Sequence, residues 1–227
     1  MKNTPDQDLM PPDCELCQKP LALCMCDQIK KLQTKKRVLI LQHPQEPDKE
    51  LGTAVLAHRM LPQSALRVGL SWPNLKKALG EEAIGARWAV LYLGSGIKVS
   101  EGQKSVSGLN FVDRAGQLVA APLPGELLGI VVLDGTWSQA KTLWWRNAWL
   151  LKLKRAVLVP SRASLYRELR KEPRRECLST LESIAEALTS LGEPATVGDG
   201  LRGVFGELLD RKRELKKSSG QANSAAR

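Results

Sequence analysis

Short and nearly continuous apolar runs alternate with helical patterns along the chain from residue 38 onward. The runs end at Gly, Pro or polar residues and span residues 38–41, 66–70, 88–93, 129–133 and 156–159. Because a strand covered on both faces needs apolar side chains at every position, such runs are typical of buried strands. The alternation of strands with helices predicts an α/β fold, with a parallel sheet flanked by helices.

Three further stretches place apolar residues at the spacing of a helix covered on one face. The first spans residues 51–58, where His58 shares the apolar face and is expected to be a packed core residue. The second spans residues 178–188 and is expected to end at Gly192, because glycine readily adopts the left-handed conformation that terminates helices. The third spans residues 201–209.

The remaining segments divide the chain into parts. Residues 94–125 are rich in Gly and Ser and predict a long loop or a small hairpin. Residues 1–30 carry four closely spaced cysteines and are predicted to form a small knuckle. Residues 36–217 form the predicted main domain, and residues 218–227, which are small and polar, predict a disordered tail.

Cys14, Cys17, Cys24 and Cys26 follow the spacing C-x2-C-x6-C-x-C. Two disulfides are one interpretation, but the N-terminus lacks the charged-then-apolar order of a secretory signal, and cytoplasmic thiols stay reduced. We therefore expect a cytoplasmic protein whose four cysteines hold a structural zinc ion. An iron–sulfur cluster or four unmetallated thiols are the alternatives. Cys177 stands alone and is expected to be a buried apolar residue.

Composition and charge narrow the function. The 227 residues include 34 Lys and Arg against 24 Asp and Glu, for a net charge of +10, and 43% are apolar. This composition excludes a disordered polyelectrolyte and a collagen-like chain, and no apolar run approaches the roughly 18–20 residues of a membrane span. Residues 141–175 contain eleven basic residues and two acidic ones. That window is either a solvated basic face or a surface for a polyanion such as nucleic acid.

The clearest local signal lies at residues 133–137, which read Leu-Asp-Gly-Thr-Trp directly after a predicted strand. One interpretation is structural: Asp134 and Gly135 make a turn, Thr136 caps a helix, and Trp137 lies on the inner face of that helix. The other is functional, because ligands of parallel α/β sheets bind beyond the carboxyl ends of the strands. There Asp134 offers a carboxylate beside the free amides of a helix start.

This string, with Ala140 and Lys141 after it, resembles the signature of the DTW-domain family. Further resemblances are the cysteine spacing, His43-Pro44-x-Glu46, Arg170-x-x-Pro173, and the sequence Cys-Leu-Ser-Thr-Leu-Glu at 177–182. The resemblance covers most of the chain and implies a fold related to SPOUT methyltransferases, with a C-terminal trefoil knot. It also implies transfer of the 3-amino-3-carboxypropyl group of S-adenosylmethionine to N3 of a uridine in the tRNA variable loop, with release of methylthioadenosine.

The resemblance makes residues 36–217 the catalytic domain and assigns roles within it. Asp134 is implied to receive the N3 proton or to fix the uracil edge, with His43 and Glu182 as further catalytic candidates. Glu182 has a structural alternative as a first-turn carboxylate favoured by the helix dipole. The residues implied to bind the cofactor are Leu93, Gly94, Leu133, Gly135, Thr136, Trp137, Ala140, Val159, Pro160, Arg170, Ser179 and Thr180. Glu46, like His43, is expected to orient the uridine substrate or the amino and carboxylate groups of the donor. The residues expected to contact phosphates of the tRNA are Lys152, Lys154, Arg155, Arg162, Arg167, Arg174 and Arg175.

Two other functions fit the same residues. A SPOUT-type RNA methyltransferase would release S-adenosylhomocysteine, and a non-catalytic zinc-knuckle RNA-binding protein would not bind the cofactor. The expected partner is tRNA, no membrane association is expected, and a monomer is compatible with the sequence.

Overall fold

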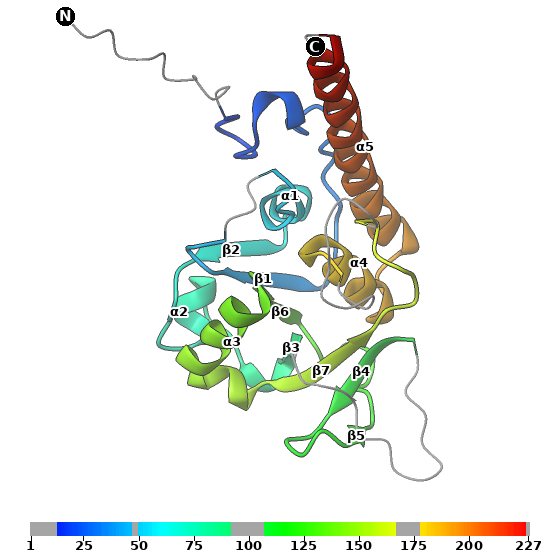
Figure 1. Cartoon of the computed structure of the whole chain (residues 1–227). Helices are drawn as coiled ribbons and strands as arrows, with labels where there is room; N and C mark the ends of the chain where they lie inside the picture. Colours follow the sequence, from blue (N-terminus) through cyan, green and yellow to red (C-terminus); the bar gives the residue numbers. More distant parts are fainter. Residues whose placement is uncertain (1–12, 47–49, 92–106, 167–177, 226–227) are drawn as a thin grey trace, which may run out of the picture.

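The computed structural model describes residues 13–46, 50–91, 107–166 and 178–225 of the chain (Figure 1). Within this part, seven strands form one sheet in the order β2-β1-β6-β3-β7-β4-β5. The strands are β1 (Arg37–Gln42), β2 (Ser64–Val68), β3 (Trp88–Leu91), β4 (Gly108–Val112), β5 (Leu118–Val119), β6 (Gly129–Asp134) and β7 (Lys154–Val159). The helices are α1 (Ala54–Met60), α2 (Leu75–Leu79), α3 (Trp137–Arg146), α4 (Thr180–Ser190) and α5 (Ala195–Ala225), with 3-10 turns η1 (Leu21–Leu23), η2 (Gly85–Arg87) and η3 (Ala148–Lys152).

The sheet is parallel at its centre and antiparallel at one edge. Strands β2, β1, β6, β3 and β7 run parallel, which confirms the predicted α/β core. The sheet as a whole is mixed, because β4 pairs with β7 in the antiparallel sense and β5 pairs with β4 as a hairpin. Of the two expectations for residues 94–125, the hairpin is therefore the correct one for the described residues. Asp113 closes its turn by accepting hydrogen bonds from the amides of Ala115 and Gln117.

Successive side chains of the central strands alternate between two apolar cores. On β1, Val38 and Ile40 lie in one core, whereas Leu39 and Leu41 lie in the other. Strand β6 alternates in the same way. Because both faces are covered, each position of these strands is apolar, which explains why the sequence pattern predicted them.

Helices cover both faces of the sheet (Figure 1). Apolar residues of α1, α4 and α5 form the first core, and those of α2, α3 and η3 form the second. The helices predicted at 51–58, 178–188 and 201–209 correspond to α1, α4 and the middle of α5. Gly192, with φ of 84°, follows the end of α4 as predicted. His58 lies at the rim of its core, half-buried, with Nδ1 2.8 Å from the hydroxyl of Ser64.

Two helical segments differ from the prediction. The short helix α2 has no long apolar repeat; Asn74 caps it by accepting the amide of Lys77, and Gly80 ends it with φ of 87°. Helix α5 continues to Ala225, so the prediction of a disordered tail is wrong for residues 218–225. Once a helix is nucleated, each added residue gains one backbone hydrogen bond, and residues 218–225 contain no proline to stop it.

Candidate functional site

The carboxylate of Asp134 lies where β1 and β6 end side by side. The parallel register pairs Asp134 with Gln42, and Gln42 Nε2 donates a hydrogen bond of 2.7 Å to Asp134 Oδ2. The hydroxyl of Thr180, at the start of α4, donates to Asp134 Oδ1. Asp134 is buried, and these two donors on different elements hold its carboxylate in one orientation.

The turn after Asp134 requires glycine. Gly135 has φ of 146°, and a Cβ at this position would lie 2.9 Å from the Cβ of Gln139. Thr136 then caps α3 in a reciprocal arrangement, because its hydroxyl accepts the amide of Gln139 and the Gln139 carbonyl oxygen accepts the amide of Thr136. Gln139 Nε2 also donates to the backbone oxygen of Gln45 at 2.7 Å. The turn is thereby tied to the segment that follows β1.

His43 is the first residue beyond β1 and is buried next to this turn. Its amide donates to the backbone oxygen of Asp134 at 3.0 Å, and its Nδ1 accepts the amide of Gln45 at 3.1 Å. Because Nδ1 is an acceptor, the proton of the neutral ring is assigned to Nε2. His43 can therefore donate a hydrogen bond to a ligand through Nε2.

Glu182 joins two segments at the start of α4. Its carboxylate accepts the amide of Ser179, while the Ser179 hydroxyl accepts the amide of Glu182, which is a capping box. The same carboxylate accepts the hydroxyl of Ser164 at 2.9 Å and the amide of Leu165 at 2.7 Å. Glu182 is buried and holds the loop after β7 against α4. These contacts favour the structural alternative for Glu182 over direct chemistry.

The candidates at the carboxyl edge of the sheet lie on four converging segments. His43 and Glu46 follow β1, Leu133 to Trp137 join β6 to α3, Val159 and Pro160 end β7, and Ser179 and Thr180 start α4. The Trp137 side chain is 42% exposed. Ala140 lies on the buried face of α3 and packs in the core. Leu93, Gly94, Arg167, Arg170, Arg174 and Arg175, as well as Cys177, lie outside the described residues.

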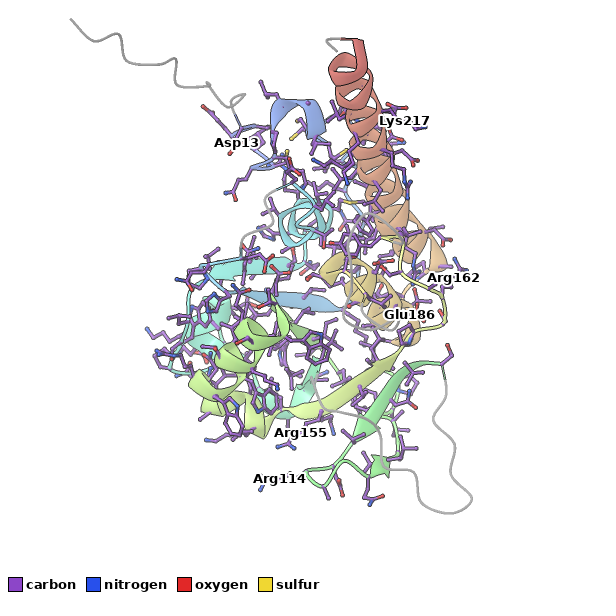
Figure 2. All side chains as sticks on the ribbon, in the orientation of Figure 1. Asp13, Arg114, Arg155, Arg162, Glu186 and Lys217 are labelled. Carbon is purple, nitrogen blue, oxygen red and sulfur yellow. The ribbon has the colours of Figure 1, made fainter. Side chains whose placement is uncertain are left out.

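The basic window does not surround Asp134 as one cluster. Lys152 and Lys154 lie at the amino end of β7, and β7 runs parallel to β3 and hence to β6. A six-residue strand spans about 17 Å, so these two lysines lie at the edge of the sheet opposite to Asp134. Figure 2 shows Arg155 and Arg162 apart from one another, near the two ends of β7. Of the basic candidates in the described part of the chain, Arg162 follows the carboxyl end of β7.

Arg155 has structural contacts of its own. Its guanidinium carbon lies 5.6 Å from the centre of the Trp144 ring, and its Nη1 donates weakly to the backbone oxygen of Arg114 at 3.4 Å. The hollow lined by Ala86, Arg87, Glu126 and Lys154 lies at this amino edge, away from Asp134. The described cavity is thus separate from the candidate site.

The four N-terminal cysteines lie close enough to share one metal ion. Their sulfur atoms lie within 4.8 Å of one another, with 3.7 Å between Cys14 and Cys26 and 3.8 Å between Cys17 and Cys24. A tetrahedral ion with sulfur ligands at about 2.3 Å has ligand atoms about 3.8 Å apart. The cysteines are free rather than disulfide-bonded, since a disulfide needs about 2.05 Å. The donor set therefore fits zinc.

The thiols of Cys14 and Cys26 differ in pKa because their surroundings differ. Backbone hydrogen bonds from Cys17 and Leu16 lower the pKa of Cys14 to about 6. Burial and hydrogen bonds with the neighbouring thiols raise the pKa of Cys26 to about 12. One ligand is thus readily available as a thiolate, and another requires a cation to displace its proton.

The cysteine module is docked onto the main domain (Figure 1). Arg211 on α5 donates to the backbone oxygen of Cys24 and, at 2.9 Å, to Asp27 Oδ2. Lys19, within the module, is buried and donates to the backbone oxygens of Glu50 and Gly52.

Sequence reasoning missed four residues that shape the site: Gln42, Thr53, Gln139 and Ser164. Gln42 offered a signal, because it is the polar residue that ends an apolar run immediately before His43. Gln139 offered another, since Thr136-x-x-Gln139 is a capping-box pattern. Thr53 accepts the amide of Leu181 from a distant segment, and no local pattern indicates that contact.

The chain matches the DTW domain family over residues 11–213, and it belongs to that family. Relatives in Macaca fascicularis and Mus musculus, each named tRNA-uridine aminocarboxypropyltransferase 2, are 30% identical over 182 and 183 residues. A relative of the same name in Drosophila melanogaster is 29% identical over 184 residues. These matches cover 79%, 79% and 78% of this chain, but 56%, 56% and 66% of the relatives. The chain therefore spans little more than half the length of the two mammalian relatives.

No solved structure matches the chain. Among the helices of the described residues, none is long and apolar enough to cross a membrane.

Proposed function

We propose that this chain is a tRNA-uridine aminocarboxypropyltransferase. It moves the 3-amino-3-carboxypropyl group of S-adenosylmethionine to N3 of a uridine in the tRNA variable loop and releases methylthioadenosine. The observation that carries the proposal is the buried carboxylate of Asp134, held by Gln42 and Thr180 within the family's signature sequence. The names of the relatives support the same activity. A tRNA substrate favours a cytoplasmic location.

Groups at the start of α3 and on the segments beside it suit the parts of S-adenosylmethionine. The capping box of α3 leaves Trp137 and Ser138 with first-turn amides that have no acceptor within the helix, and such amides suit the donor's carboxylate. The carboxylate of Glu46 suits its ammonium group, and the exposed Trp137 side chain and Val159 offer apolar surface for its adenosine. When bound, the sulfonium supplies an activated carbon–sulfur bond.

The uracil edge matches the polar groups around Asp134. Its N3–H is a donor flanked by two carbonyl oxygens, so recognition needs an acceptor between donors. Asp134 supplies the acceptor, and the proposed donor is the Nε2–H of His43, whose amide is hydrogen-bonded to the backbone oxygen of Asp134. As the N3–carbon bond forms and the carbon–sulfur bond breaks, the N3 proton passes to Asp134, or to water while Asp134 holds N3 in line with the carbon. Orientation of this kind can supply about 7–11 kcal/mol of the barrier.

The basic residues divide into two groups in this proposal. Arg162, which follows the carboxyl end of β7, contacts phosphates close to the target uridine. Arg167, Arg174 and Arg175 are proposed as further phosphate contacts, and Arg170 as part of the cofactor pocket. Lys152, Lys154 and Arg155 contact the tRNA farther away, since they lie at the amino end of β7, opposite to Asp134. Affinity for tRNA should therefore fall steeply as salt rises.

We propose that the ion held by Cys14, Cys17, Cys24 and Cys26 is zinc, which the tetrahedral sulfur distances support. We also propose that the main domain is SPOUT-like with a C-terminal trefoil knot, which the family resemblance supports.

Mass analysis of tRNA nucleosides tests the proposed reaction. Unmodified tRNA is incubated with S-adenosylmethionine labelled in the methionine arm, and the expected products are labelled 3-(3-amino-3-carboxypropyl)uridine and methylthioadenosine. Methyluridine with S-adenosylhomocysteine would instead indicate a methyltransferase. If calorimetry detects no binding of S-adenosylmethionine, the chain is a non-catalytic RNA-binding protein.

A substitution at Asp134 tests the site itself. Asp134→Asn should lower kcat by about 100-fold or more, because the acceptor for the N3 proton is lost. Asp210→Asn is the matched control, since Asp210 lies on the exposed part of α5 and pairs with Arg213. Full activity of Asp134→Asn would remove Asp134 from the role of general base.

A further inference from the structure

The tryptophans of α3 and η3 divide into a buried pair and an exposed pair. Four of the six tryptophans lie between residues 137 and 149. Trp144 and Trp149 are buried, and Trp149 Nε1 donates to the backbone oxygen of Trp72 at 3.0 Å. Trp137 is 42% exposed and Trp145 is 75% exposed. Core packing therefore accounts for Trp144 and Trp149 but not for the exposed pair, and the proposed cofactor site accounts for Trp137 but not for Trp145.

The exposed pair lies on one face of α3. Trp137, Lys141 and Trp145 follow each other at intervals of four residues, and all three are exposed. Residues four apart are neighbours on a helix surface. At about 1.5 Å per residue, Trp145 lies about 12 Å along the helix axis from Trp137. We call this row, Trp137–Lys141–Trp145, the α3 stripe.

The α3 stripe begins at the candidate site. Trp137 is the first residue of α3 and follows the turn that contains Asp134 and Gly135. Lys141 is one helical turn farther away, and Trp145 is two turns away. A ligand that extends from Asp134 along α3 would therefore pass Trp137, which borders the proposed cofactor site, and then meet the cation of Lys141 and the aromatic ring of Trp145.

The charge around the stripe favours a polyanion. Residues 135–167 contain no Asp or Glu. Lys141, Arg146 and Lys152 are all exposed on α3 and η3, and Arg155 lies over the ring of Trp144, next to Trp145 in sequence. A protein partner that docks through apolar contacts gains little from this many cations, whereas RNA offers both phosphates and the flat faces of its bases.

We propose that the α3 stripe binds a single-stranded segment of RNA next to the target uridine, with one base stacked on Trp145 and one phosphate at Lys141. This inference rests on the proposed function, because it takes the site at Asp134 to act on RNA. The separation of about 12 Å corresponds to three or four stacked nucleotides at about 3.4 Å each. The stripe selects a target whose neighbouring bases are unpaired, since bases inside a duplex have no free face to stack.

Binding measurements at several salt concentrations test the stripe. Two probes are used: a single-stranded oligouridylate of about eight nucleotides and tRNA that lacks the modification. Each probe carries a fluorescent label, and its binding is measured by fluorescence anisotropy. Trp145→Ala should weaken the binding of both probes about 5- to 150-fold, with an unchanged salt slope, because stacking is not an ionic interaction. Trp145→Phe should retain most of the affinity, since an aromatic face remains. Lys141→Gln should lower the magnitude of the salt slope by about 0.7, as expected for one phosphate contact to a single strand.

A substitution outside α3 serves as the control. Leu123→Ala removes an apolar side chain that is 70% exposed outside α3 and should leave binding unchanged. Wild-type affinity in Trp145→Ala, or an equal loss in Leu123→Ala, would overturn the proposed surface. If the chain modifies tRNA and Trp145→Ala leaves both affinity and kcat/KM unchanged, the surface is rejected and the proposed function stands. If RNA binding depends on Trp145 but no aminocarboxypropyluridine forms, the surface stands and the proposed function is rejected.

Discussion

Lys19 joins the four-cysteine module to the main domain, and its replacement by methionine measures what that junction contributes. The side chain is 1% exposed. Its Nζ donates hydrogen bonds of 2.7 Å to the backbone oxygens of Glu50 and Gly52, in the loop before α1. Methionine has a similar length and no donor, so Lys19→Met deprives two part-buried carbonyl oxygens of this partner. An unsatisfied buried acceptor costs about 1–3 kcal/mol, and we expect a loss of about 2–4 kcal/mol of unfolding free energy.

The same loop connects Lys19 to the start of α4. Thr53, next to Gly52, accepts the amide of Leu181 through its hydroxyl at 3.1 Å. Loosening the loop should therefore increase hydrogen exchange at the Leu181 amide. The neighbouring Thr180 donates to Asp134, so the effect would extend to the candidate site.

Urea unfolding of the metal-loaded protein, followed by tryptophan fluorescence, gives the magnitude for Lys19→Met. Lys31→Met is the matched control, because Lys31 Nζ donates to the backbone oxygen of Arg59 at 2.5 Å but lies on the exposed surface. That variant should change stability by less than about 0.5 kcal/mol. Metal content is measured in both variants to confirm that the cysteines remain loaded. A loss of stability in Lys19→Met no larger than that in Lys31→Met would refute the assigned role of Lys19.

Three further predictions concern the turn, the metal cluster and a histidine. Gly135→Ala should destabilise the fold by about 1–3 kcal/mol, measured by urea unfolding, because alanine disfavours the positive φ and its Cβ would lie too close to Gln139; an unchanged midpoint would contradict the geometry of the turn. Zinc affinity, measured by competition with a chelator, should tighten at least about tenfold per pH unit through neutral pH, because Cys26, with a pKa of about 12, must release its proton on binding; a pH-independent affinity would show that Cys26 is not a ligand. Burial, followed by the nearby charges, lowers the pKa of His58, so its neutral form is favoured in the folded state. Its contribution to stability is therefore present above its unfolded pKa of about 6.5 and is lost as pH falls through the folded pKa; urea midpoints of the wild type and His58→Gln should converge or cross below that pH, and parallel curves would refute the assignment.

Much of the framework is local and could be predicted. The central strands are apolar at every position because both faces of the sheet are covered, so the runs at 38–41 and 129–133 match β1 and β6 closely. Gly192 ends α4 because glycine tolerates the left-handed conformation. The cysteine spacing indicated a metal site because its ligands lie within thirteen residues, where chain connectivity alone keeps them close.

Other features depend on packing and were missed for that reason. The helix α2 has only five residues, too few for a recognisable period. The extension of α5 to Ala225 follows from helix propagation rather than from an apolar pattern. The basic window is continuous in the sequence, yet Lys152 and Arg162 are separated because a whole strand runs between them.

The amino-acid sequence by itself determined the order of strands and helices, the four-cysteine cluster and the turn at Gly135, since each depends on the side-chain chemistry and backbone freedom of nearby residues. Only the tertiary structure decided what surrounds Asp134. Gln42 reaches it across 92 residues because parallel pairing aligns the ends of β1 and β6, and Thr180 reaches it because α4 packs over the same core. Such contacts depend on the register of the sheet and on burial of apolar faces, which belong to the folded chain as a whole.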